Sequence, residues 1–335
     1  RHQLLLGLEL SLQPISYRNS SGNLASINIF NPVYGAQPTN ITLRNEQSID
    51  INTAGPYIQD LITLLPNLKL MLGGRYDYID RQLSDRVIGV NTSRQDTRFS
   101  PRVGLVYEPF EGITFYAGYS TSFIPVSDIT AIRTQSKLFA PEIGKQYEVG
   151  VKLDLSKRLT ATVAGYELKR ENVLTTSPTD QTVSIAVGEQ RSRGAEVDLT
   201  YQIIAGWNVL VAYAYTDAEV TKDNAIQIGN RPNNVPMNSA RLWSSYNVSA
   251  GPLAGLMVGA GLYAVGRRFG DTANSFTLPG YVTVDASASY SWSRYRASLR
   301  INNLLDKTYF ESADSRNAVF AGVPFTALGT IAATF

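Results

Sequence analysis

The residues best suited to chemistry in this sequence are carboxylates set two positions apart. Glu196 and Asp198 have the side-chain types and the proximity that general acid–base catalysis uses. In an extended chain, residues two apart lie on the same face of a strand, so strand geometry explains the pair without a catalytic role. We therefore predict no catalytic residues and expect that the protein is not an enzyme.

Histidine and cysteine offer almost no further chemistry. The chain has no cysteine, which excludes disulfides, thiolate metal sites and cysteine nucleophiles, and His2 is its only histidine. A Ser-His-Asp triad or a histidine zinc site would have to use this one residue. We predict no metal site and no cofactor bound by the protein itself, and interpret His2 as a residue at a water–membrane boundary near a strand end. An outer-membrane hydrolase that uses His2 is the enzymatic alternative.

The segment from Lys145 to Tyr166 shows which elements must hold the charged side chains. Apolar and polar residues alternate between Tyr147 and Leu155, and this period of two sends successive side chains to opposite faces of a strand. A short polar turn at 156–158 and a second alternating run complete an antiparallel hairpin. The strands run for about ten residues or more, the length that a tilted strand needs to cross a bilayer, whereas soluble strands usually stop after about five or six.

Charged residues fall on the polar face of these strands throughout the chain. In a transmembrane barrel this face lines the lumen, where the charges would meet water or whatever fills the lumen. The residues that we predict to face the lumen and to contact a plug are Glu148, Lys152, Asp154, Glu196, Asp198, Asp285, Arg296 and Arg300.

The alternation predicts an all-β fold, a transmembrane antiparallel β-barrel with about fourteen strands in this chain. Turns of a few residues alternate with loops of roughly ten to forty residues, which is typical of outer-membrane barrels. The polar stretch from about Ser11 to Asn52 is predicted as one long loop. Another loop is predicted around Arg81 and Arg98, where the arginines up to Arg102 could attract an anionic ligand or lipopolysaccharide phosphates, although the intervening aspartates favour a solvated loop.

Composition agrees with a membrane barrel and excludes other classes. A net charge of +2, from 30 Lys and Arg against 28 Asp and Glu, is unlike the basic surface of a nucleic-acid-binding protein. With 19 Tyr, 12 Phe and only 17% charged residues, the chain has the aromatic content of interfacial belts. We expect residues 1–335 to form a single barrel domain; a tyrosine-rich soluble β protein is the alternative.

Aromatic residues in the predicted loops are candidates for ligand binding, because their rings could stack on a ligand at the barrel mouth. The alternative is that they pack within the loops or anchor them at the interface. The candidates are Tyr17, Phe30, Tyr34, Phe139, Phe269, Phe276, Tyr309, Phe310 and Phe320. At the other end of the last strand, Phe335 follows Ala333 and Ile331 on one face and is similar to the C-terminal signal that the barrel assembly machinery recognises.

Several short motifs resemble those of TonB-dependent siderophore receptors, closest to the ferrichrome-type group. The resemblance covers essentially the whole chain. It is carried by Ile27 to Gly35 (INIFNPVYG), Tyr57 to Asp60 (YIQD), Leu72 to Asp77 (LGGRYD), Phe99 to Gly104 (FSPRVG), Pro141-Glu142 with Gln146 to Gly150 (QYEVG), Arg193 to Glu196 (RGAE) and Asn302 to Tyr309 (NNLLDKTY).

This resemblance implies a barrel of 22 strands closed by an N-terminal plug domain, with a TonB box ahead of the plug. We identify neither the plug nor the box in these 335 residues, and interpret the chain as the C-terminal portion of such a receptor. The implied function is uptake of ferric siderophores, of the hydroxamate type, across the outer membrane with energy from the TonB complex. The iron would arrive already chelated by the siderophore. A passive pore or structural barrel is the alternative function.

Overall fold

The computed structural model describes residues 1–125, 129–156, 158–177, 179–180 and 183–335. Fourteen strands form one continuous antiparallel sheet in which every strand pairs with its neighbours in chain order, apart from two small hairpins inserted in loops. The prediction of an all-β fold with about fourteen strands is therefore confirmed. Lys157, which belongs to the turn predicted at 156–158, lies outside the described residues.

The large sheet follows the order of the sequence. Its strands are β1 (His2–Asn23), β2 (Thr39–Leu65), β3 (Leu68–Asp85), β4 (Val90–Phe110), β5 (Ile113–Ile124), β6 (Glu142–Ser156), β7 (Leu159–Thr176), β8 (Ser184–Ile204), β9 (Trp207–Lys222), β10 (Asn238–Asn247), β11 (Leu256–Val265), β14 (Tyr281–Trp292), β15 (Tyr295–Asn302) and β18 (Thr326–Ala333). The two small hairpins are β12 (Arg268–Phe269) with β13 (Thr277–Leu278), and β16 (Phe310–Ser315) with β17 (Ala318–Ala321); the helix α1 spans Ile129–Gln135.

Two segments predicted as loops are largely strands. β1 continues to Asn23 and β2 begins at Thr39, so most of the segment between Ser11 and Asn52 is paired, and the charged segment around Arg81 and Arg98 is a hairpin with a turn at 86–89. At about 3.3 Å per residue, the 22 residues of β1 extend far beyond a hydrocarbon core of about 30 Å. Outside the bilayer both faces of a strand meet water, so polar residues occupy both and the alternation that reveals a strand disappears.

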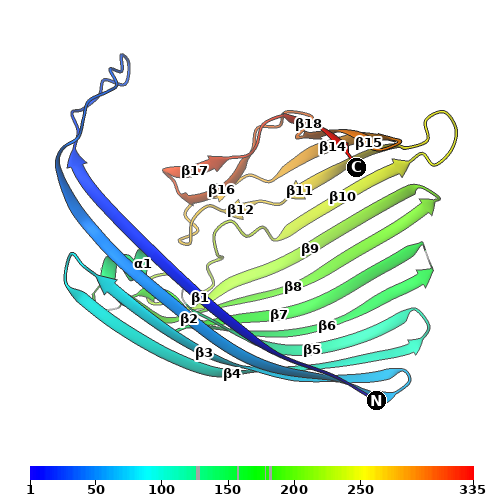
Figure 1. The fold of residues 1–335 in the computed structure, drawn as a ribbon, viewed down its shortest axis with the longest axis horizontal. Coiled ribbons are helices and arrows are strands. Elements are labelled where there is room, and N and C mark those ends of the chain that lie inside the picture. Colours follow the sequence, from blue (N-terminus) through cyan, green and yellow to red (C-terminus); the bar gives the residue numbers. More distant parts are fainter. Residues whose placement is uncertain (126–128, 157, 178, 181–182) are drawn as a thin grey trace.

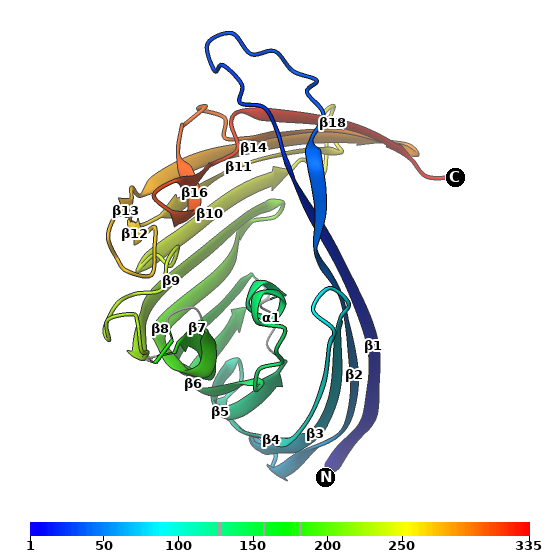
Figure 2. The same ribbon diagram turned by 90° about the vertical axis from the view of Figure 1, so that its left-hand side faces the viewer.

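The sheet curves strongly around α1, and β1 and β18 are its two edges (Figures 1 and 2). No ladder joins these two edge strands within the described ranges. The short turns and both chain termini lie at one end of the strands, and the long loops lie at the other (Figure 1). A short turn at 205–206 illustrates the first end: Gly206 has a φ of +87°, a conformation that residues with a Cβ rarely adopt.

The convex face of the sheet is apolar. On β1 it carries a row of leucines between Leu4 and Leu12 that are 60–79% exposed, and on β6 it carries Tyr147 and Val149. Exposed apolar surface of this extent marks contact with lipid or a partner. It fits the outer wall of a membrane barrel, whose lipid-facing band is apolar. No α-helix in the described part of the chain is long and apolar enough to span a bilayer.

The concave face holds the only compact apolar core that the described residues form. Ala131 and Ile132 of α1, together with Leu138 and Phe139, pack against Ile49 of β2 and Leu83 of β3. We call residues 129–141, which comprise α1 and its connection to β6, the inward segment. The sequence does not predict its helix, because the segment is short and its apolar partners lie far away in the sequence.

Candidate functional site

All eight charged residues predicted for the barrel lumen lie on the concave face. Register shows this directly: Lys152 pairs with Thr162, and Thr162 pairs with Asp198, so the three side chains point to the same side of β6, β7 and β8. Ladders carry this face on one side to Ile49 and Leu83, against which the inward segment packs, and on the other side to Arg300. Contact of these residues with a plug stays a prediction.

Glu148 is the best anchored of these charges. The hydroxyl of Tyr116 donates to Oε1 at 2.8 Å, and the amide of Gln146 donates to Oε2 at 2.9 Å. The ammonium of Lys152 lies 5.7 Å from the centre of the Tyr116 ring. These groups line a cavity of about 520 Å³ that also reaches Arg102. With both oxygens engaged, this carboxylate is suited to hold a fixed negative charge at the wall.

A second cavity, of about 550 Å³, brings together Asp198, Asp285 and Arg300, which lie on three different strands. Arg241 and Trp243 of β10 also line it. We did not single out these two residues from the sequence, although the alternation within Asn238–Asn247 places both on the polar face. The Trp243 ring lies over Gly259 and Gly261, where an added Cβ would come within 2.7 and 2.6 Å of it.

The Gly-x-Gly run at 259–261 therefore provides a flat floor for an indole ring and is not a nucleotide-binding motif. Asp285 accepts a hydrogen bond at 2.9 Å from the main-chain N–H of Asn303, and Arg300 donates to Asn302 at 3.0 Å. This cavity has cations and carboxylates in equal number among its lining residues. It can bind a polar surface without selecting one sign of charge.

The remaining predicted charges are less constrained. Arg296 donates to the hydroxyl of Ser289 at 3.2 Å. Glu196 stands between Ala164 and Ala214 in the ladders, so its carboxylate is flanked by small side chains. Asp154 lies next to the short turn between β6 and β7.

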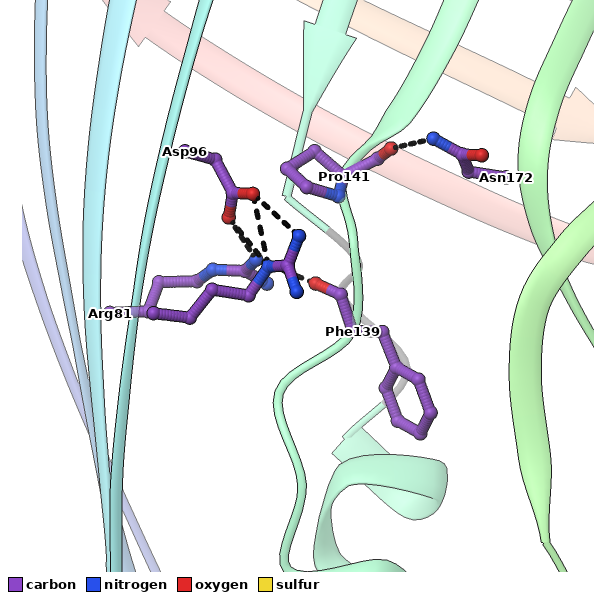
Figure 3. A network of polar contacts seen from close by, with 6 residues as sticks. Arg81, Asp96, Phe139, Pro141 and Asn172 are labelled. Carbon is purple, nitrogen blue, oxygen red and sulfur yellow. Dashed lines mark hydrogen bonds and ion pairs between the residues drawn. The ribbon is translucent and has the colours of Figure 1, made fainter.

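The inward segment bridges the concave face between two groups of strands (Figure 3). The buried guanidinium of Arg81 on β3 donates to Asp96 at 2.8 Å and to the main-chain oxygen of Phe139 at 2.6 Å. On the far side, the side-chain amide of Asn172, in β7, donates to the main-chain oxygen of Pro141 at 2.9 Å. These contacts hold the segment across β4 to β6, near the ends of the strands that carry the long loops.

The structure corrects two of the predicted loop aromatics. Tyr17 lies within β1, where it pairs with Gln47, because β1 extends past the bilayer. Phe139 is only 3% exposed and belongs to the core of the inward segment. A ligand can meet the Phe139 ring only after the segment moves, so in this conformation Phe139 is a packing residue.

Three other candidates, Phe269, Phe276 and Tyr309, lie where the loops 266–280 and 303–325 meet, and we call this region the loop cluster. The rings of Tyr309 and Tyr281 are tilted by 32° with their centres 4.2 Å apart, and the guanidinium of Arg268 lies 5.3 Å from the centre of the Tyr281 ring. Arg268 is buried and donates to the main-chain oxygens of Phe310 and Glu311. The ring of Phe276 lies under Arg316 at 5.4 Å, and Phe269 forms part of β12.

The exposed candidates lie at the tips of loops. Phe30 and Tyr34, in the connection between β1 and β2, are 92% and 82% exposed, and this connection projects away from the sheet (Figure 1). Phe310 and Phe320 are about half-exposed on the β16–β17 hairpin. At the opposite end of the molecule Phe335 is exposed, with Arg294 lying 5.8 Å from its ring. Ligand binding by these aromatics and recognition of Phe335 stay predictions.

Within the described ranges, no three His, Cys, Asp or Glu side chains gather as metal ligands. Residues 1–304 match the family model described as TonB dependent receptor-like, beta-barrel. The chain belongs to the TonB-dependent receptor family. This confirms the resemblance found in the sequence.

Curated relatives of this chain are receptors and transporters by name. The ferrichrome outer membrane transporter/phage receptor of Escherichia coli (strain K12) is 38% identical over 84% of the chain and 38% of its own length. The metal-pseudopaline receptor CntO of Pseudomonas aeruginosa is 36% identical over 97% of the chain and 47% of its own length. The ferrioxamine B receptor of Salmonella typhimurium is 32% identical over the whole chain. The chain thus spans about two-fifths to half the length of these relatives.

Solved structures confirm the barrel fold for this TonB-dependent receptor chain. The siderophore receptor PiuA from Acinetobacter baumannii superposes with a TM-score of 0.83 at 25% identity, covering 98% of this chain and 52% of PiuA. The ferric-catecholate import receptor Fiu from Escherichia coli K12 superposes with a TM-score of 0.79 at 23% identity, which shows the fold alone. These relatives are receptors and transporters by name.

Proposed function

We propose that this chain forms the C-terminal part of an outer-membrane receptor barrel that takes up ferric siderophores. The complete barrel would have 22 strands around a plug domain, and the TonB complex would energise transport through that plug. The observation that carries the proposal is the curved sheet itself, which is apolar on its convex face and carries charged side chains on its concave face, in a chain of this family.

The ligand that we propose is a ferric siderophore of the hydroxamate type, the chemical class of ferrichrome and ferrioxamine B. Support comes from the relatives named for these two ligands, at 38% and 32% identity. The siderophore already fills the coordination shell of the iron, so the protein needs to recognise the outer surface of the complex. Aromatic rings and fixed charges at the mouth, such as those of the loop cluster, suit that task.

Other partners follow from the same proposal. The apolar convex face would contact outer-membrane lipid and lipopolysaccharide, and the barrel assembly machinery would recognise the exposed Phe335. The charged residues of the concave face would contact the plug. Nucleic acid has no place among these partners, since the chain has a net charge of only +2.

Uptake of radioactive iron tests the proposal. Cells of the source organism, starved of iron, are given ⁵⁵Fe-ferrichrome, ⁵⁵Fe-ferrioxamine B or a ferric catecholate as the control. We expect deletion of the gene to abolish uptake of one hydroxamate complex, and inactivation of TonB to have the same effect. Uptake that persists without TonB, together with solute conductance of the purified protein in planar bilayers, would favour a passive pore instead.

A further inference from the structure

A third cavity on the concave face, of about 390 Å³, lies over β2 to β5. Ladders define two adjacent rows of side chains at this place. The first row runs from Gln59 through Gly73 to Arg102, and the second runs from Tyr57 through Arg75 to Ser100. All six residues line the cavity.

Gly73 leaves the floor of the first row without a side chain. A Cβ at this position would lie 3.1 Å from the main-chain oxygen of Ile58 and 3.4 Å from the side chain of Gln59. With hydrogen in its place, no side chain stands between Gln59 and Arg102 in this row of the cavity lining. A small group can therefore enter between these two polar side chains.

The other charges at the cavity are already neutralised. Arg75 donates to Asp77 at 2.5 Å and to Glu9 at 2.6 Å. The guanidinium of Arg75 lies over Gly55, where an added Cβ would come within 2.1 Å of Nη2. The Arg75 side chain is therefore directed toward these two carboxylates and away from Gly73. Glu9 and Asp77 are consequently paired with Arg75, and Arg102 is the cation on the other side of the cavity.

Arg102 and Ser100 line this cavity and form no polar side-chain contact with the residues that the structure describes. No hydrogen bond or ion pair from the Arg102 side chain is formed with any described residue, and this side chain is exposed on the concave face. Ser100 is 7% exposed, and its buried hydroxyl also lacks a partner in the described part of the chain. A cation, a hydroxyl and the amide of Gln59 thus offer hydrogen-bond donors around one opening.

We infer that this cavity binds a carboxylate, held by the Arg102 guanidinium and assisted by the Ser100 hydroxyl. A guanidinium presents paired N–H donors that match the two oxygens of a carboxylate, and an exposed, unpaired guanidinium keeps its full charge for the ligand. The carboxylate can belong to a small organic acid or to an Asp or Glu side chain of a polypeptide segment within the lumen. The first source is independent of the proposed transport function, and the second rests on the plug proposed there.

Thermal unfolding of the protein, purified at its native length from outer membranes into detergent, tests the inference. Succinate at low ionic strength is the probe, and chloride at equal ionic strength is the blank. We expect succinate to raise the midpoint of unfolding, with the apparent affinity reduced at least tenfold by Arg102→Gln and severalfold by Ser100→Ala. The matched control is Lys69→Gln, which removes a cation from the same face of β3 outside the cavity.

A second outcome identifies the other source of the carboxylate. If succinate has no effect on the wild type but Arg102→Gln lowers the midpoint of unfolding more than Lys69→Gln does, a carboxylate of the protein itself occupies the cavity. The heat-dependent mobility of the folded barrel on gels shows that each variant has folded. Equal behaviour of Arg102→Gln and Lys69→Gln, with or without a succinate effect, would overturn the inference.

Discussion

The guanidinium of Arg81 donates a hydrogen bond to the main-chain oxygen of Phe139 at 2.6 Å, although 58 residues separate them in the chain. The same guanidinium reaches Asp96, so one buried side chain ties the inward segment to both β3 and β4. The concave face is therefore narrowed by a segment that is held both by polar contacts and by the apolar core around Phe139. Its release can be measured apart from the stability of the sheet.

We expect Arg81→Met to loosen the inward segment and to lower the free energy of unfolding by about 1.5–3 kcal/mol, the range for hydrogen bonds to charged groups. Hydrogen exchange should speed up at residues 131–140 and stay unchanged in β10 and β11. Arg86→Met is the control, because its pair with Glu46 spans 3.6 Å and the Arg86 side chain is 76% exposed. That change should cost less than about 1 kcal/mol. Unaltered exchange at 131–140 in Arg81→Met would show that the polar contacts do not hold the segment.

Phe139 and Phe320 should respond to truncation in different ways, since one ring is buried and the other is half-exposed. Phe139→Ala is expected to cost about 3–5 kcal/mol of stability, as for other buried phenylalanines. Phe320→Ala is expected to leave stability unchanged and to weaken ligand binding. Equilibrium unfolding and titration with the ferric siderophore identified by uptake distinguish the two effects. If Phe320→Ala binds the siderophore as tightly as the wild type does, Phe320 on the β16–β17 hairpin is not part of the ligand site.

Val151 and Lys152 are neighbours on β6 that face opposite sides of the sheet. Val151 lies on the convex face, opposite Phe115 and Val163 in the ladders. Val151→Lys should therefore cost about 2–4 kcal/mol in lipid, the range for a lysine at the bilayer midplane. Lys152→Ala, on the concave face, should change stability by less than about 0.5 kcal/mol. Reversible urea unfolding in lipid vesicles measures both, and equal tolerance at the two positions would refute the assignment of the faces.

The loop after β9 should lose order in acid because of Asp223. Burial raises the pKa of this carboxyl, but hydrogen bonds from the Thr175 hydroxyl and from the main-chain N–H groups of Ile226, Ala225 and Asn224 lower it by more, so the pKa lies below its ordinary value of 3.8. The ionised form is thus favoured in the folded state. The stabilisation is present above the unfolded pKa and is lost as the pH falls through the folded pKa.

Hydrogen exchange at residues 223–237 is the measurement for this prediction. Protection should be constant between about pH 5 and 7 and should fall progressively below about pH 4. Asp223→Asn keeps a hydrogen-bond acceptor without the charge and should abolish this pH step. Asp314→Asn, at an exposed carboxylate on the β16–β17 hairpin, is the control and should leave the step in place. A step that survives in Asp223→Asn would assign the acid sensitivity to another group.

The strands that cross the apolar band could be predicted from the sequence because their signal is local. In β6, Tyr147 and Val149 alternate with Glu148 and Gly150, and the bilayer on one side and polar groups on the other impose this order. Outside the bilayer the same backbone pairing continues without the pattern. The sequence therefore predicts a loop where the hairpin from Arg81 to Arg94 forms, although the register of this hairpin is regular.

Local patterns in the chain were sufficient to predict the antiparallel sheet, its apolar and polar faces, and the family, because each depends on residues close together in the chain. Which charges meet became clear only from the folded chain. Curvature brings Asp198, Asp285 and Arg300 to one cavity, and the fold of the inward segment buries Phe139 beside Arg81. The fold also directs Asp77 and Glu9 to Arg75, so these two carboxylates do not pair with Arg102. These relationships join residues tens of positions apart, and their geometry depends on the register and curvature of the whole sheet, which alternation alone does not encode.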